Sequence, residues 1–103
     1  MTLPRQGELW WAVALDKRRP VMVITRSEAV EVLTGIVVAP VTRTVRGIET
    51  EIPLDHREGL PVICAASFDN LQRVDRRALS ARIGSLGPRR AEICRALAAL
   101  ADC

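Results

Sequence analysis

The side chains best suited to chemistry in this sequence are basic, and one stretch of its first half carries several of them with few carboxylates. Between residues 17 and 46, six basic side chains stand against the two carboxylates of Glu28 and Glu31; the six are Lys17, Arg18, Arg19, Arg26, Arg43 and Arg46. A guanidinium group binds two phosphate oxygens at once and stays charged at any physiological pH. A basic segment of this kind is typical of a surface that binds phosphate groups.

The histidine and cysteine content indicates neither a metal site nor a pair of catalytic histidines. His56 is the one histidine, and a single histidine cannot serve as both the acid and the base of a reaction. Cys64, Cys94 and Cys103 lack the spacing of metal-binding cysteines. We therefore expect buried free thiols with one frayed terminal thiol, no metal and no other cofactor.

Length and composition predict one small globular domain over residues 1–103, with 49% hydrophobic residues to build its core. The net charge of +3 is compatible with an acidic partner. The polar first residues do not resemble a signal peptide, and the longest apolar run, 36–41, is too short to cross a membrane. Because the odd number of cysteines also favours free thiols, we predict a protein of the reducing cytoplasm.

Hydrophobic patterning predicts that the first two-thirds of the chain form strands, and these would position the basic side chains. Residues 7–15 alternate so that Trp10 and Trp11 face opposite ways, and one of them is expected in the core. Residues 16–19 are predicted as a turn, and Pro20 as the start of the next strand. Pro40 predicts an edge or a bulge within its strand. The further predicted strands are 20–25, 35–42, 48–54 (with one wet face), 61–67 and 80–86, and residues 68–75 are expected to be irregular.

One long helix is predicted at the end of the chain, entered through Gly87 and Pro88. Its apolar stripe is expected to consist of Ile93, Cys94, Leu97, Ala98, Leu100 and Ala101. Several short strands with one packed helix favour a mainly β fold, a small, partly open barrel with a C-terminal α-helix.

Five segments of the chain resemble, in the same order, motifs of the MazF/PemK family of toxin endoribonucleases. These segments are GELWWAVAL, KRRPVMVIT, GIVVAPVTRT, FDNLQRVDRRAL and ARIGSLGPRR. No single segment identifies the family, but the five segments in this order over nearly the whole chain are a strong indication of it together. The resemblance implies an SH3-like barrel that forms a homodimer and binds single-stranded RNA in a groove across the dimer. It also implies metal-independent, sequence-selective cleavage to 2′,3′-cyclic phosphate and 5′-hydroxyl ends, growth inhibition, and a small acidic antitoxin as partner.

The resemblance also assigns roles to individual residues. Arg19, just before the proline of the second strand, matches the family's catalytic arginine, and Thr42, which ends the next strand, matches its catalytic threonine. Asp69 matches an aspartate used by some members, and it is our candidate for the general base. The residues expected to contact RNA are Lys17, Arg18, Arg43, Asn70 and Gln72. A guanidinium at position 19 would stabilise phosphate charge, and a hydroxyl at position 42 would hold the scissile group in line.

The chain departs from the family pattern at three places. The loop between the first two predicted strands is short, about five residues from Asp16 to Pro20, where many members have a long one. Asn70 replaces a frequent glutamine, and Ser67 replaces an arginine that is catalytic in one class of members.

Two other functions are compatible with the same barrel, because a fold does not determine a function. One is a non-enzymatic toxin that acts on DNA gyrase in the manner of CcdB. The other is a non-catalytic SH3-like interaction module. Neither requires an arginine beside a strand-ending threonine.

Overall fold

The computed structural model describes residues 3–14 and 17–101. Within these residues the chain forms strands and two α-helices, in the order β1 (Glu8–Ala14), β2 (Lys17–Val23), α1 (Ser27–Val30), β3 (Gly35–Thr42), β4 (Glu51–Leu54), β5 (Cys64–Ser67), β6 (Gln72–Asp75), β7 (Leu79–Ser85) and α2 (Ala91–Leu100). Short 3-10 turns η1 (His56–Glu58), η2 (Phe68–Asn70), η3 (Arg76–Ala78) and η4 (Gly87–Arg89) connect them.

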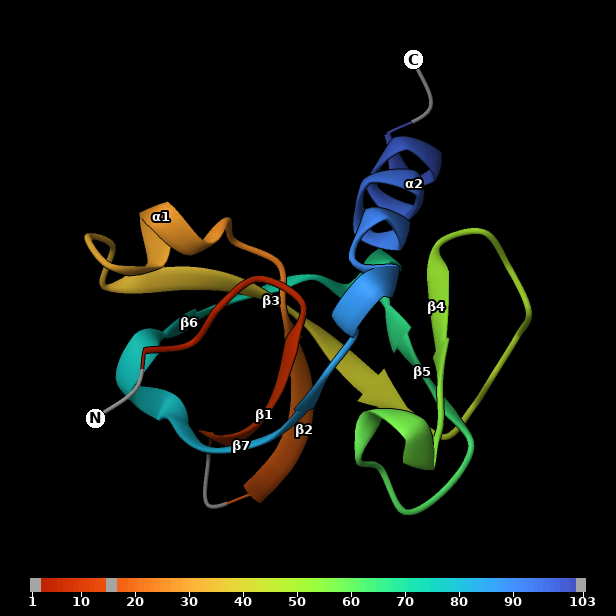
Figure 1. Ribbon diagram of the computed structural model, residues 1–103, viewed down its shortest axis with the longest axis horizontal. Helices are drawn as coiled ribbons and strands as arrows, with labels where there is room; N and C mark the ends of the chain where they lie inside the picture. The colour runs from red at the N-terminus through yellow and green to blue at the C-terminus, as the bar shows by residue number, and fades with distance from the viewer. Residues whose placement is uncertain (1–2, 15–16, 102–103) are drawn as a thin grey trace.

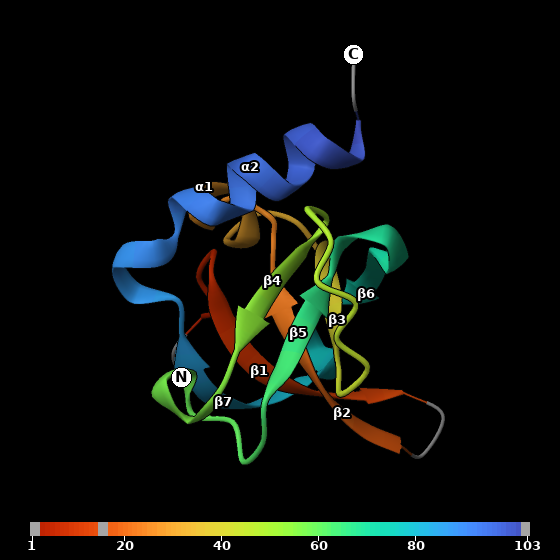
Figure 2. The ribbon, with the colours of Figure 1, turned by 90° about the vertical axis from the view of Figure 1, so that its right-hand side faces the viewer.

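The strands form one curled antiparallel sheet, with α2 packed at one end of it (Figures 1 and 2). The strand order is β4-β5-β3-β2-β1-β7, and β6 pairs with β3 beside this path. This half-barrel with a C-terminal helix confirms the predicted fold class. Among the described residues, no helix has the length and apolarity needed to cross a membrane.

The central strands are buried on both faces, which explains their nearly continuous apolar sequences. On β1, alternation sends Leu9 to one core, where it joins Met22 and Ile93, and sends Trp10 to a second core with Val21. Trp10 is 8% exposed. It is therefore the core tryptophan of the pair.

β3 changes partners along its length, and Pro40 lies at the changeover. Its first half, Gly35–Val38, pairs with β6, and Val41 and Thr42 pair with β5. Among the described pairs, Ala39 and Pro40 have partners on the β2 side alone. A residue without an N–H is tolerated at such a break, as the sequence predicted.

The predicted turn at 16–19 is wrong, because β2 already begins at Lys17. Pro20 lies inside this strand opposite Trp11 and does not start it. From Lys17 to Pro20 the pairing described for β2 is with β1, so the strand is an edge there and tolerates a proline. The basic side chains at 17–19 are therefore carried by a two-stranded arm, and the tip between Ala14 and Lys17 lies outside the described residues.

Two other strands are shorter than predicted, and one strand was missed. β4 and β5 begin at Glu51 and Cys64, three residues later than expected. Glu51, expected on the wet face, is 7% exposed. The stretch expected to be irregular contains β6, whose polar sequence carries little strand signal by itself and whose pairing with β3 is non-local.

The predicted helix stripe is partly wrong. Ile93 and Ala96 are the buried residues of α2, and Leu97 packs beside them, whereas Cys94, Ala98, Leu100 and Ala101 are exposed. Cys64 is buried as expected, whereas the expectation of a buried thiol is wrong for Cys94, which is exposed. Cys103 lies outside the described residues. The helix thus contributes a narrow strip to the core and leaves most of its circumference uncovered in the single chain.

Candidate active site

β2, β3 and β6 border a groove of about 520 Å³, which we call the Arg19 groove. Arg19 and Lys17 from β2 stand on one side, and Gln72 from β6 stands on the other. Apolar side chains form much of the wall; the whole lining is Ala12, Val13, Lys17, Arg19, Val21, Pro40, Gln72, Val74, Asp75 and Ala78. Arg19 and Gln72 are both exposed, so the groove combines apolar walls with a few polar groups, as ligand sites do.

The β2–β3 ladder ends two residues short of Arg19 on β2 and of Thr42 on β3. Val23 pairs with Val38 and Val21 with Pro40, and the ladder ends there. Beyond that point Arg19 pairs with Ala12 of β1, and Thr42 pairs with Ala65 of β5. Because side chains alternate along a strand, Arg19 faces the same side of β2 as Val21, which also lines the groove, whereas Thr42 is not among the lining residues.

The Thr42 side chain is half-buried, and its hydroxyl oxygen accepts the backbone N–H of Thr44 at 3.1 Å. A hydroxyl has one proton to donate as well as its acceptor positions. The bond to Thr44 therefore orients the Thr42 oxygen while leaving its proton available for a ligand.

Asp69 and Asn70 are not among the residues that line the Arg19 groove. Both lie in η2, where Asp69 Oδ2 accepts the Thr50 hydroxyl at 2.6 Å and Asn70 Nδ2 donates to the Ser67 hydroxyl at 2.9 Å. Their side chains tie η2 to the segments around β4 and β5. The assignment of Asp69 as general base stays a prediction.

Two other predicted RNA contacts lie outside the groove. Arg18 stacks on the Trp11 ring, with its guanidinium carbon 4.8 Å from the ring centroid. Alternation puts Arg18 on the opposite face of β2 from Lys17 and Arg19. Arg43 is exposed in the segment that follows Thr42.

Sequence reasoning missed Asp75, which lines the groove because the unpredicted strand β6 carries it there. Hydrogen bonds from the Arg77 side chain and backbone lower the pKa of Asp75 to about 2. The groove therefore has a permanent negative charge near one end and positive charge on β2. A polar four-residue strand offered no pattern that could have located this carboxylate.

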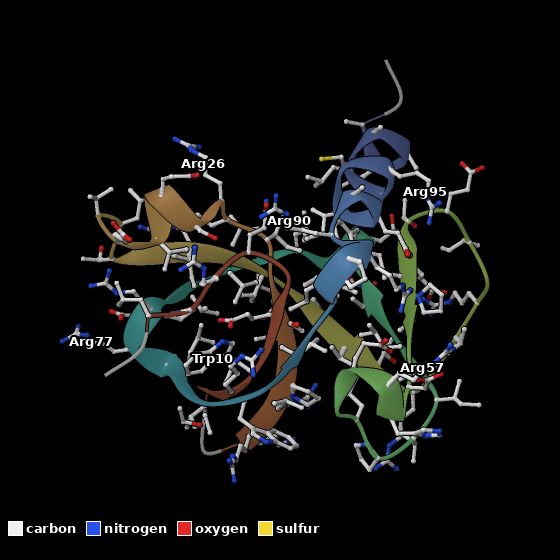
Figure 3. All side chains as sticks on the ribbon, viewed as in Figure 1. Trp10, Arg26, Arg57, Arg77, Arg90 and Arg95 are labelled. Atoms are coloured by element: carbon white, nitrogen blue, oxygen red, sulfur yellow. The ribbon has the colours of Figure 1, made fainter. Side chains whose placement is uncertain are left out.

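Basic charge is also spread elsewhere over the surface. Figure 3 shows Arg26 and Arg77 projecting on one side of the molecule and Arg95 on the other. Several arginines are engaged in ion pairs, including Arg77 with Asp75 and Arg89 with Glu58 and Glu92. His56 lies in η1 and is not part of the groove lining. Among the described residues, no group of three or more His, Cys, Asp and Glu side chains could hold a metal ion.

Comparison with known proteins points to one family. The model of PemK-like, MazF-like toxins of type II toxin–antitoxin systems matches residues 5–101. A probable endoribonuclease MazF2 of Mycobacterium tuberculosis is 39% identical over 101 residues, 96% of this chain and 99% of that protein. The solved structure of the Mycobacterium tuberculosis toxin MazF-mt6 is 36% identical, with a TM-score of 0.84 over 92% of this chain and 96% of its own.

A more distant structure shares the fold. It is described as an endoribonuclease in complex with its cognate antitoxin from a mycobacterial species, and it is 18% identical to this chain. Its TM-score is 0.83 over 96% of this chain and 95% of its own.

Proposed function

The chain belongs to the family of PemK-like, MazF-like toxins of type II toxin–antitoxin systems, its relative MazF2 is named a probable endoribonuclease, and we propose that it cleaves single-stranded RNA at the Arg19 groove. The observation that carries this proposal is the open groove lined by Lys17 and Arg19 of β2, near the point where the β2–β3 ladder ends.

The chemistry we propose uses the RNA's own 2′-hydroxyl as the nucleophile. The 2′-oxygen forms a bond to phosphorus while the bond from phosphorus to the 5′-oxygen breaks, which gives a 2′,3′-cyclic phosphate and a 5′-hydroxyl. The Arg19 guanidinium neutralises charge on the non-bridging oxygens, and it stays protonated throughout. The Thr42 hydroxyl donates to one of these oxygens and holds the phosphate in line.

A proton must also leave the 2′-hydroxyl, and one must reach the 5′-oxygen. We propose Asp69 as the acceptor of the first and solvent water as the source of the second. Its carboxylate would have to exchange the Thr50 hydroxyl for the RNA hydroxyl when substrate binds.

Further RNA contacts follow from the placement of the predicted residues. Lys17 and Gln72 are within the groove and are proposed to hold the strand next to the scissile phosphate. Arg43 extends the basic surface beyond Thr42. Arg18 and Asn70 face other directions, so they would contact RNA where it leaves the groove.

We propose that the working state is a homodimer controlled by a small acidic antitoxin in the cytoplasm. Membership of a type II toxin–antitoxin family supports an antitoxin partner, and the mycobacterial complex shows such a pair in a protein of the same fold. Exposed apolar side chains such as Val13 and Ile63, at 48% and 72% exposure, give a single chain surface for protein partners to cover.

The alternatives of a gyrase toxin and a non-catalytic module are not favoured, because the relatives are named endoribonucleases. The test is cleavage of two matched RNA oligonucleotides by the purified protein in excess EDTA. One carries a 2′-deoxy sugar 5′ of the cut site, which removes the nucleophile. We expect cutting of the all-ribose strand alone; cutting of the deoxy strand, or loss of activity with EDTA, would contradict the mechanism.

A further inference from the structure

The segment between β3 and β4 begins immediately after Thr42 and swings out from the sheet (Figures 1 and 2). It carries two exposed arginines, Arg43 and Arg46. We call residues 43–48, all of them exposed, the arginine loop. An exposed loop with few packed side chains needs other contacts to keep a defined position.

Glu51, the first residue of β4, supplies such a contact. Its Oε1 accepts the backbone N–H groups of Arg46 and Gly47, each at 3.0 Å. Gly47 has a φ of +69°, in the left-handed region. Two successive N–H groups that converge on one anion through a left-handed residue form an anion-binding nest, and here the anion is a side chain of the same protein.

The second carboxylate oxygen shows that position 51 is not simply part of the core. Glu51 is 7% exposed, and Oε2 is buried with no hydrogen-bond partner among the described residues. The residue Glu51 also borders an open pocket of about 630 Å³ between the arginine loop and α2. Burying an unpaired carboxylate oxygen costs free energy that an apolar side chain would not cost. The two hydrogen bonds that Oε1 accepts from the loop are what the structure shows to offset this cost.

The two ends of the segment are held differently. At its far end, Thr50 bonds to Asp69 through its hydroxyl and to the N–H of Phe68 through its carbonyl oxygen. At its near end, the Thr42 hydroxyl oxygen accepts the backbone N–H of Thr44. Between them, the hydrogen bonds described for Arg46 and Gly47 go to Glu51.

We propose that Glu51 is a positioning residue for RNA cleavage: it holds the arginine loop so that Arg43 and Arg46 face the RNA and Thr42 keeps its place. Glu51 itself does not touch RNA. Its importance for cleavage rests on the proposed function, whereas its hold on the loop does not.

The experiment compares Glu51→Ala and Glu51→Gln with Glu49→Ala, which removes the same charge from an exposed position in the same segment. Trypsin cleavage after Arg43 and Arg46 and hydrogen exchange at the Arg46 and Gly47 amides report the loop without RNA. Steady-state RNA cleavage reports kcat and KM, and circular dichroism reports folding.

We expect Glu51→Ala to raise trypsin cleavage at these two sites about tenfold and to lower kcat by about ten- to a hundredfold, since small misplacements cost this much. Glu51→Gln should retain most of both properties, because its amide oxygen still accepts the two N–H groups. Glu49→Ala should match the natural protein in the trypsin assay.

Unchanged trypsin cleavage and exchange in a folded Glu51→Ala protein would overturn the proposal, as would a loosened loop with unchanged kcat. A loosened loop together with no RNA cleavage by the natural protein would instead overturn the proposed function and leave the hold on the loop standing.

If Glu51→Ala does not fold, Gly47→Ala tests the same contact: a Cβ there meets nothing within 4 Å, but the positive φ disfavours alanine. Loop cleavage unchanged in Gly47→Ala would then count against the proposal.

Discussion

Arg19 and Thr42 each lie two residues beyond Val21 and Pro40, the last pair of the β2–β3 ladder. Two prolines flank this point: Pro20 precedes the last paired residue of β2, and Pro40 is its partner on β3. Because proline has no N–H to donate, the ladder is weakened where the catalytic pair is proposed to work.

Replacing either member of this pair is expected to remove cleavage from a folded protein. Arg19→Ala should lower kcat by about 10²–10³, as the loss of one oxyanion-stabilising donor does. Arg19→Lys should recover little, because an ammonium cannot grip two oxygens in the guanidinium geometry. Thr42→Ser should retain activity that Thr42→Val loses, since it keeps the hydroxyl. Single-turnover cleavage with a thermal melt of each variant makes the measurement.

The matched control is His56→Ala, which is expected to keep most of the activity because His56 lies in η1, away from the groove lining. An inactive His56→Ala beside an active Arg19→Ala would place the chemistry elsewhere.

The parts of this site that the sequence predicts are those set by local patterning. β3 is predicted with its observed bounds, because a β-branched run ends at a glycine on one side and a polar turn on the other. The strand arm that carries Lys17 and Arg19 is not predicted. Three basic residues followed by proline favour a turn by themselves, and they form a strand because they pair with β1. Asp75 and Glu51 could not be placed either, since burial and groove position of a charged residue depend on non-local pairing.

Stability is expected to depend on Arg89, which joins η4 to β4 and α2. It donates to Glu58, to Glu92 and to the carbonyl oxygen of Pro53. The Glu58 side chain is 7% exposed, so Arg89→Ala leaves a buried carboxylate without its cation. We expect a loss of about 2 kcal/mol in the free energy of unfolding, and a melting temperature about 10 °C lower.

The control for Arg89 is Arg57→Ala, whose ion pair with Asp55 is at the surface, the Arg57 side chain being 81% exposed. Urea denaturation of both variants should show little change for Arg57→Ala. Equal losses in the two variants would mean that the Arg89 network adds nothing beyond an exposed ion pair.

Acid sensitivity is expected to come in part from Glu8. Burial by itself raises the pKa of this carboxyl, but hydrogen bonds from Trp10, Arg82 and the Arg5 N–H outweigh it, so the pKa is lowered from its usual 4.5. The folded state therefore binds this proton less readily than the unfolded state. The contribution is fully present above about pH 4.5 and is lost as the pH falls through the lower folded-state pKa.

Glu8→Gln should accordingly unfold more easily than the natural protein near pH 7, with the difference shrinking as the pH falls below 4.5. Urea midpoints between pH 3 and pH 7 make this measurement. A difference that stays constant over that range would show that Glu8 acts through packing and not through its charge.

Inhibition by an acidic antitoxin is expected to compete with RNA at the Arg19 groove. Lys17 and Arg19 stand on an exposed strand arm and Arg43 extends the basic surface, so carboxylates of an extended peptide can occupy the positions of RNA phosphates. A disordered acidic tail that orders on binding suits this surface, because it wraps a large area without a fold of its own. Raising salt should weaken inhibition, since exposed charge pairs are screened beyond about 10 Å at 0.1 M ionic strength.

The measurement is the inhibition constant of the product of the neighbouring open reading frame at several RNA and salt concentrations. Lys17→Ala should weaken inhibition and RNA binding together, while Arg57→Ala, on an exposed side chain outside the groove, should leave both unchanged. Inhibition that does not respond to RNA concentration or to Lys17→Ala would place the antitoxin on another face, and growth unaffected by expression of the chain alone would contradict its action as a toxin.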